Sequence, residues 1–219
     1  MTRILNVNVY DLTESIIACR NAMRIVPPQY TQKEEFELSL ERAKKLCKTK
    51  SNSGHQTFLS GIRVSFDIIY PNYLSPELQR YHWVDIVTSS SKMHRLLDMD
   101  LDMCCNKYVS KSMINEMRQH IQLYKDIQAT DEIVDMEFYL RDDSRIIAKN
   151  KDEALYIAFM ICLSNCPQGI ELFMRVSTNY QQLKTIYHQR KHHKLREDWG
   201  ELCKMIEKLP FFEELIKNQ

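Results

Sequence analysis

Residues 54–91 read GHQTFLSGIRVSFDIIYPNYLSPELQRYHWVDIVTSSS, and this stretch decides the fold. Apolar and polar side chains alternate over 62–70, which predicts a long strand with one buried face. Pro71 ends the strand. Ser75 followed by Pro76 is typical of a helix start, and we expect a helix over about 76–88 that leads into a serine-rich loop.

The segments on either side predict further strands and helices. Alternation predicts strands over 3–10 and 170–176. Capping patterns and apolar residues at helical spacing predict helices over 12–25, 32–48, 110–127, 150–167, 179–190 and 195–208, with 130–148 open to either interpretation. Asp11 with Glu14 forms a possible capping box for the first of these helices. The elements do not alternate as strict βαβ units, so an α+β domain is favoured over a doubly wound sheet. A length of 219 residues suits one domain over 1–219.

Composition excludes several classes of protein. Thirty basic residues stand against 29 acidic ones, whereas a dedicated duplex-DNA binder is usually much more basic. The longest apolar run, IAFMICL at 157–163, is far shorter than the roughly 20 residues that span a bilayer. The first residues contain no long apolar segment of the kind found in signal peptides. We therefore expect a soluble, cytoplasmic protein.

Cysteine and histidine spacing gives no sign of a disulfide framework or a metal centre. The seven cysteines are odd in number, and none forms a CxxC pair. Cys104 and Cys105 lie near no predicted base, so we expect buried thiols in a reducing compartment and no catalytic thiol. His188 and His192 are four residues apart on one helical face, but no cysteine or carboxylate at ligand spacing joins them. We expect no metal.

Polar side chains gather in two segments, 55–95 and 179–196. In both segments, a predicted strand is followed directly by a predicted helix. The N-terminus of a helix attracts anions. Arginine side chains in these segments match phosphate groups bidentately. The two interpretations are an anion-binding cradle and a set of solvated helix ends and loops.

The stretch 54–91 resembles the core of the flavin-dependent thymidylate synthases (ThyX). Gly54-His55-Gln56-Thr57 stands where that family has Gly-His-Glu-Thr-Pro, followed by a long strand and a proline. Arg80-Tyr81-His82 stands at the family's Arg-His-Arg signature, before spaced serines. The strand and helix over 174–190, ending in His188-Gln189-Arg190, resemble the family's later nucleotide-binding segment.

The resemblance implies a ThyX-like fold, in which a mixed or antiparallel sheet packs against several helices. It also implies a homotetramer that binds FAD between subunits and methylates C5 of dUMP, or of a related pyrimidine nucleotide, with NADPH and methylenetetrahydrofolate as co-substrates. The resemblance implies that the flavin is bound by Thr57, Arg80, His82 and Asn179. It implies that the nucleotide is bound by Gln79, Arg80, Ser90, Ser91, Arg95 and Arg190. Arg190 would be the catalytic residue, stabilising negative charge on the uracil ring.

Two departures from the family pattern keep alternatives open. The signature triplet reads Arg-Tyr-His, and Tyr156 stands where the family has a helix arginine. Each lost charge-assisted phosphate hydrogen bond costs roughly 1.5–3 kcal/mol. The alternatives are a catalytically degenerate nucleotide- or protein-binding module on the same scaffold, and a single-stranded nucleic-acid binder built on the basic cluster at 188–196.

Overall fold

The computed structural model describes residues 1–49, 54–133, 135–142 and 144–218. The chain forms two compact units. The first unit consists of Met1–Tyr70, Leu74–Ser89 and Phe173–Gln219, and the second consists of Pro71–Tyr73 and Ser90–Leu172. The single domain expected over 1–219 stays a prediction.

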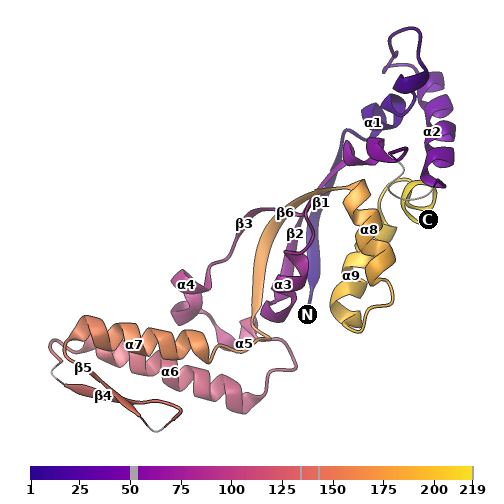
Figure 1. Ribbon diagram of the computed structural model, residues 1–219. Coiled ribbons are helices and arrows are strands. Elements are labelled where there is room, and N and C mark those ends of the chain that lie inside the picture. The colour runs from indigo at the N-terminus through magenta and orange to yellow at the C-terminus, as the bar shows by residue number, and fades with distance from the viewer. Residues whose placement is uncertain (50–53, 134, 143, 219) are drawn as a thin grey trace. The chain divides into compact units, whose positions relative to one another are not determined.

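The first unit is built on a sheet whose strand order is β1-β2-β6-β3 (Figure 1). The strands are β1 (Arg3–Tyr10), β2 (Arg63–Pro71), β3 (Asp85–Ser89) and β6 (Glu171–Asn179). β1 runs antiparallel to β2, and β3 runs antiparallel to β6. The strands expected at 3–10, 62–70 and 170–176 are confirmed, as is the α+β class.

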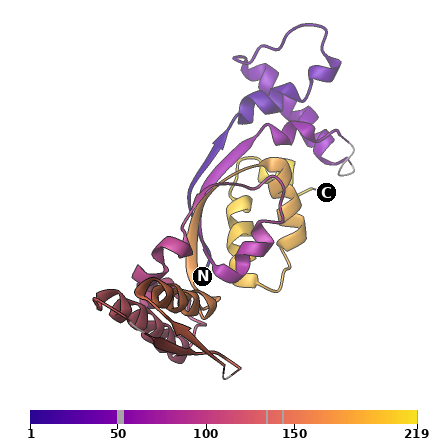
Figure 2. The same cartoon turned by 60° about the vertical axis from the view of Figure 1, so that its left-hand side comes forward.

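One face of this sheet is buried under helices. Val64, Phe66 and Ile68 alternate with less buried neighbours along β2, as the sequence pattern predicted. Helices α8 (Tyr180–Arg190) and α9 (Arg196–Glu207) lie along the sheet in both views (Figures 1 and 2). The Thr2 hydroxyl donates to Asp198 Oδ1 at 2.7 Å, which ties the start of β1 to α9.

The opposite face of the sheet carries a polar network. Arg175 on β6 donates to Asp67 Oδ1 at 3.0 Å and to Ser65 Oγ at 2.8 Å, both on β2. Asn6 donates to Asp67 Oδ2 at 2.6 Å. The hydrogen bonds from Asn6 and then Arg175 lower the pKa of Asp67. These bonds fix the spacing of β1, β2 and β6 on this side.

Further helices complete the first unit. They are α1 (Leu12–Ala18), α2 (Lys33–Cys47), α3 (Ser75–Leu78) and the one-turn segments Asn21–Met23, Thr57–Ser60 and Phe212–Ile216, the second of which is called η2 below. α2 confirms the helix expected over 32–48, and α9 the one over 195–208. The helix expected over 12–25 ends early, at Ala18. Asp11 lies in the left-handed region with φ 56° and its side chain makes no capping hydrogen bond, so the expected capping box is wrong.

The helix expected over 76–88 is also wrong. α3 ends at Leu78, and 85–89 is strand β3, which pairs with β6. Ser75 is the first helical residue of α3 and not its cap. Thr178 Oγ1 donates to the Trp83 carbonyl at 2.7 Å, which draws the chain onto the sheet. The β-branched run in DIVTS then completes a ladder with β6, a tertiary contact that outweighs the local helical pattern.

The second unit is a helical pair with a hairpin. It contains α4 (Lys92–Arg95), α5 (Leu101–Cys104), α6 (Lys111–Ala129), β4 (Met136–Tyr139), β5 (Arg145–Ala148), α7 (Lys151–Ser164) and the one-turn segment Leu96–Asp98. A further one-turn segment, Asn72–Leu74, precedes α3. α6 and α7 confirm two expected helices, and the open region 130–148 is an antiparallel hairpin. Asn150 caps α7 by accepting from the Glu153 backbone N–H at 3.0 Å. No helix among the described residues is long and apolar enough to cross a membrane.

A buried lysine lies between α8 and α2. Lys184 is 4% exposed, and its Nζ donates to the Cys47 carbonyl at 3.0 Å. Gln56 Nε2 donates to the same carbonyl oxygen at 3.3 Å. Burial lowers the pKa of Lys184, because the charged ammonium loses its hydration.

We expect Lys184→Met to raise the free energy of unfolding by about 1 kcal/mol at pH 7, since a desolvated charge is removed while Gln56 still satisfies the carbonyl. The pKa of Lys184 is lower in the folded state, so the unfolded chain binds more protons and the wild type gains stability as pH rises toward the unfolded value. The advantage of the variant therefore shrinks from pH 7 to pH 10. Urea unfolding of both proteins at several pH values measures this difference, and a constant or growing difference contradicts it.

Candidate functional site

The segment 79–83 lies along helix α8 in the first unit. The Trp83 backbone N–H donates to Gln182 Oε1 at 3.3 Å, near the start of the helix. The Tyr81 hydroxyl donates to Gln189 Oε1 at 3.1 Å and accepts from Arg190 Nε at 2.6 Å, near its end. The signature-like triplet and the end of α8, which are about a hundred residues apart in the chain, are therefore neighbours.

Arg190 is held by a set of aromatic and acidic partners. Its Nη1 donates to Glu77 Oε2 at 3.1 Å, and its guanidinium carbon lies 4.4 Å from the centroid of a Trp199 ring. Trp199 Nε1 donates to the same Glu77 oxygen at 2.9 Å, and His193 Nε2 lies 3.8 Å from it. Arg190 Nη2 makes no hydrogen bond to the described residues. The side chain is thus fixed in place: one face of its guanidinium packs on Trp199, and Nη2 can still donate a hydrogen bond.

Glu77 and Trp199 are functional candidates that the sequence did not reveal. Glu77 lies in the first turn of α3, where an acidic residue is expected to stabilise the helix through its dipole. Trp199 lies 122 residues away, on the buried stripe of α9. No local pattern predicts that the two side chains meet over Arg190.

Asn179 and Thr57 lie at the opposite end of α8. Asn179 is buried and caps the helix, since its Oδ1 accepts from the Gln182 backbone N–H at 2.9 Å. Its Nδ2 is the atom left for a ligand. Thr57 begins η2, which packs on α8, and its hydroxyl donates to the Gly54 carbonyl at 2.6 Å.

Thr57 also lines a pocket of about 520 Å³ between α1, α2 and η2. His55, Ser60 and Arg42 line the same pocket. A second pocket, of about 470 Å³, shares Met23 and Arg42 with the first. Arg20, Arg24 and Glu35 line the second pocket, and we call the two together the arginine cleft.

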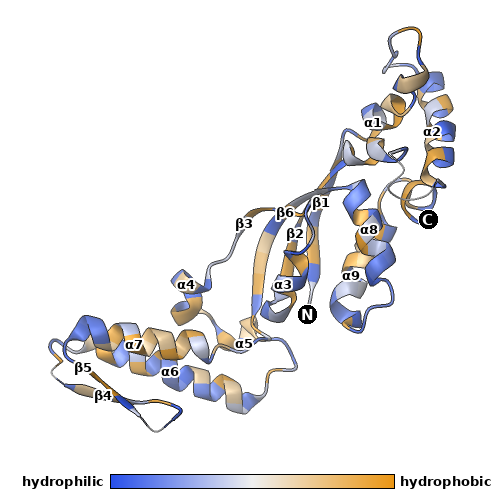
Figure 3. Ribbon diagram, viewed as in Figure 1, coloured by the Kyte–Doolittle hydropathy of each residue, from blue (hydrophilic) through white to orange (hydrophobic). Residues whose placement is uncertain are grey.

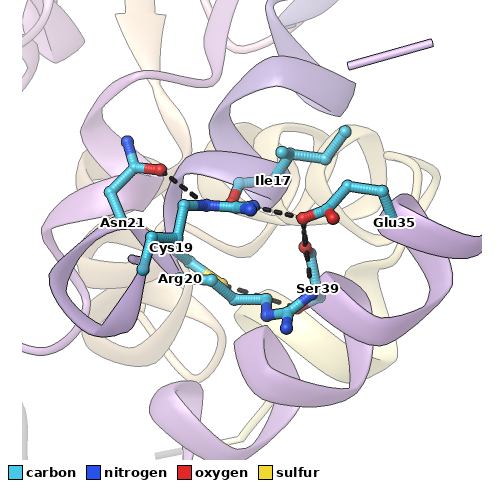
Figure 4. Close-up of polar contacts among 7 residues, drawn as sticks. Ile17, Cys19, Arg20, Asn21, Glu35 and Ser39 are labelled. Carbon is cyan, nitrogen blue, oxygen red and sulfur yellow. Dashed lines mark hydrogen bonds and ion pairs between the residues drawn. The ribbon is translucent and has the colours of Figure 1, made fainter. Parts of the chain in front are cut away.

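The arginine cleft carries a net positive charge. Glu35 pairs with Arg24 and, at 3.3 Å, with Arg20, and Ser39 Oγ lies 3.5 Å from the same carboxylate (Figure 4). The hydrogen bond from Arg24 is the main cause of the lowered pKa of Glu35. Arg42 has no ion-pair partner among the described residues. Three arginines against one glutamate leave a surplus of positive charge, with Arg42 free to bind a phosphate.

Burial makes Cys19, Cys104 and Cys105 weak candidates for a nucleophile. Burial raises the pKa of Cys19, beside the arginine cleft, to about 11, and the three nearby arginines do not reverse this. Burial likewise raises the pKa of Cys105 to about 11 and that of Cys104 above its ordinary value. A neutral thiol is a poor nucleophile, so these side chains act as packing groups.

The remaining predicted residues fall into two sets. Gln79, Arg80 and His82 are exposed on the first unit, where Gln79 Nε2 donates to Ser75 Oγ at 3.1 Å. Ser90, Ser91 and Arg95 belong to the second unit, where Ser91 occupies the N-cap position of α4. The structure therefore brings Thr57, the triplet, Asn179 and Arg190 to one helix, and it places the serines and Arg95 in the other unit.

The basic cluster at 188–196 is partly tied into the fold. His188 Nε2 lies 3.0 Å from the Ile216 carbonyl oxygen, so this ring nitrogen is used by the backbone. Arg190 and His193 face Glu77. Across the described part of the chain, no group of three or more His, Cys, Asp or Glu side chains is arranged to hold a metal ion.

Comparison with known proteins gives a fold and no sequence relative. No family model matches this sequence, and no curated protein does either. The structure is similar to that of the flavin-dependent thymidylate synthase ThyX from Helicobacter pylori complexed with FAD and dUMP, with a TM-score of 0.62 and 12% identity over 98% of both chains. A second crystal structure of Helicobacter pylori ThyX with FAD and dUMP aligns with a TM-score of 0.54 and 15% identity, over 99% of this chain and 98% of that one.

Proposed function

We propose that this chain is a ThyX-like protein that binds FAD and a pyrimidine nucleotide such as dUMP, and that transfers a one-carbon unit to C5 of that nucleotide. The observation that carries the proposal is the match of the fold over 98% of both chains to ThyX with FAD and dUMP. The proposal includes NADPH and methylenetetrahydrofolate as co-substrates and a homotetramer as the active assembly.

The arginine cleft suits the phosphates of the flavin cofactor. Arg42 offers an unpaired guanidinium at the junction of the two pockets, and Arg20 and Arg24 add positive charge around it. Thr57 lies in the same cleft, where its oxygen can accept from a ribose hydroxyl. Bound flavin supplies the hydride and one-carbon chemistry, and this chain supplies the binding groups and their orientation.

The nucleotide would be held along α8 by Arg190 and by the two exposed side chains of the triplet, Arg80 and His82. Glu77, Tyr81 and Trp199 lock the guanidinium of Arg190 before any ligand arrives, and Nη2 remains to face an oxygen on the uracil ring. A fixed positive charge of this kind stabilises negative charge that develops on the ring and needs no reorganisation. Arg80, His82 and Gln79 are exposed beside it, and Asn179 Nδ2 offers a further donor to the flavin. Ser90, Ser91 and Arg95 are proposed for the nucleotide phosphate.

Absorbance and calorimetry test the binding. Purified protein should be yellow or should take up one FAD per chain on titration, and it should then bind dUMP. Light scattering should give the mass of a tetramer. Colourless protein that gives no heat with FAD or with dUMP contradicts the proposal.

The second candidate is binding without turnover. Two observations favour it: the Arg190 guanidinium is paired with Glu77, and exposed Tyr156 stands where the family has an arginine. Release of tritium from 5-³H-dUMP with FAD, NADPH and methylenetetrahydrofolate rules this candidate out. Binding of FAD and dUMP with no release supports it.

A further inference from the structure

The second unit has a groove between the hairpin β4–β5 and helices α6 and α7. Its volume is about 810 Å³, which lies within the roughly 300–1,000 Å³ of small-molecule sites. Aromatic and aliphatic side chains form most of its wall, from Phe138 and Tyr139 on β4, Ile146 on β5, and Tyr156 and Met160 on α7. Tyr156, which stands where the ThyX family has a helix arginine, lines it, and none of the residues proposed to bind FAD or the nucleotide does.

Helix α7 is the reason that the groove is apolar. Ala154, Ala158 and Cys162 are buried on one face, residues 154–163 all carry apolar or aromatic side chains, and much of the helix is coloured as hydrophobic (Figure 3). A helix that is apolar on all sides needs cover on more than one side. Tyr156 and Met160 lie on another face and are exposed, Tyr156 to 66%. The hairpin covers α7 only in part.

A few polar groups interrupt this wall. His120 Nε2 is buried at the groove and has no hydrogen-bond partner among the described residues. A buried polar atom without a partner is costly, so this nitrogen suits a hydrogen bond from a ligand. Glu116 Oε1 is 3.9 Å from it, beyond hydrogen-bond distance, on a side chain that is mainly exposed.

The groove wall carries charges of both signs, from Arg141 and from Glu116. Glu137 also lines it, but its Oε1 accepts from Arg145 Nη1 at 3.0 Å, so its charge is already balanced. Arg141 has no ion-pair partner among the described residues and stands at the same wall. An unpaired guanidinium beside aromatic rings favours an acidic group attached to a flat apolar body.

We propose that this groove binds a small aromatic carboxylic acid. Its rings pack against Tyr156, Phe138 and Met160, and its carboxylate pairs with Arg141. His120 Nε2 forms a hydrogen bond to a polar atom of the ligand.

Calorimetry with 2-naphthoate and its uncharged analogue 2-naphthamide tests this on the full chain. We expect one naphthoate per chain, bound about tenfold more tightly than naphthamide, because a hydrogen bond to a charged group is the stronger one. Arg141→Gln should remove that difference and leave naphthamide binding unchanged. Met160→Glu should abolish naphthoate binding, since it places a negative charge against the wall.

Met113→Glu is the matched control, because Met113 is another exposed methionine, on α6, that does not line the groove. It should bind naphthoate as the wild type does, and circular dichroism should show all three variants folded. The proposal is overturned if naphthoate does not bind, or if wild type, Arg141→Gln and Met160→Glu bind it equally. Loss of naphthoate binding in excess FAD overturns it as well, because the ligand would then occupy the nucleotide site.

Discussion

Replacing Arg42 with glutamate is expected to weaken FAD binding by about 100-fold or more. Arg42 has no ion-pair partner among the described residues and lines both pockets of the arginine cleft. The change removes a charge-assisted hydrogen bond to phosphate, worth about 1.5–3 kcal/mol, and places a negative charge against the ligand. Titration followed by flavin absorbance, at one fixed salt concentration, measures the loss.

Lys45→Glu is the matched control for this prediction. Lys45 is exposed on the same helix, α2, it undergoes the same change of charge, and it lines neither pocket. Its FAD affinity should stay within about threefold of wild type, since screening weakens charge effects at a distance. An equal loss in both variants would show a general field effect and would count against the cleft as the phosphate site.

Replacing Trp199 with alanine is expected to lower the free energy of unfolding by about 3–5 kcal/mol, as for other large-to-small core changes. Trp199 is 1% exposed, and the cavity left behind adds to the lost transfer free energy. Glu77 also loses its indole donor, and Arg190 loses the ring on which it is stacked. Urea unfolding followed by circular dichroism measures the change.

Two further variants separate the causes. Trp199→Phe keeps a ring under Arg190 and removes the N–H donor, so it should cost less than alanine does. Trp83→Ala removes the same side chain from a position that is 55% exposed, and it should cost less than about 1 kcal/mol. Comparable losses at 83 and 199 would contradict the assignment of Trp199 as the anchor of Arg190.

The reliable part of the sequence was its periodicity. The alternation over 62–70 correctly predicts a strand, and the helical spacing over 32–48 correctly predicts a helix. One face of each element is buried, so apolar residues recur with the period of that element. The sequence also predicts the helix start at Asn150. The capping hydrogen bond joins Asn150 to the backbone N–H of Glu153, only three residues later, so a local pattern reveals it. The segment 76–88 departs from its local pattern, because the strand at 85–89 exists only through pairing with β6.

The candidate site divides in the same way. The resemblance predicts Thr57, Arg80, Asn179 and Arg190 as site residues, and their roles stay predictions. The sequence predicts neither their surroundings nor the arginine cleft, because Arg20 and Arg24 belong to one expected helix and Arg42 to another, and no local pattern joins them.

The sequence by itself determined the α+β class, most element boundaries and the polar segments worth examining, since each of these follows from patterns within a few residues. Only the tertiary structure decided that Glu77 and Trp199 hold Arg190, and that Arg42 stands unpaired beside Thr57. Such facts depend on pairs of side chains that lie far apart in the chain. Their meeting is set by how the helices pack on the sheet, for which no local pattern carries a signal.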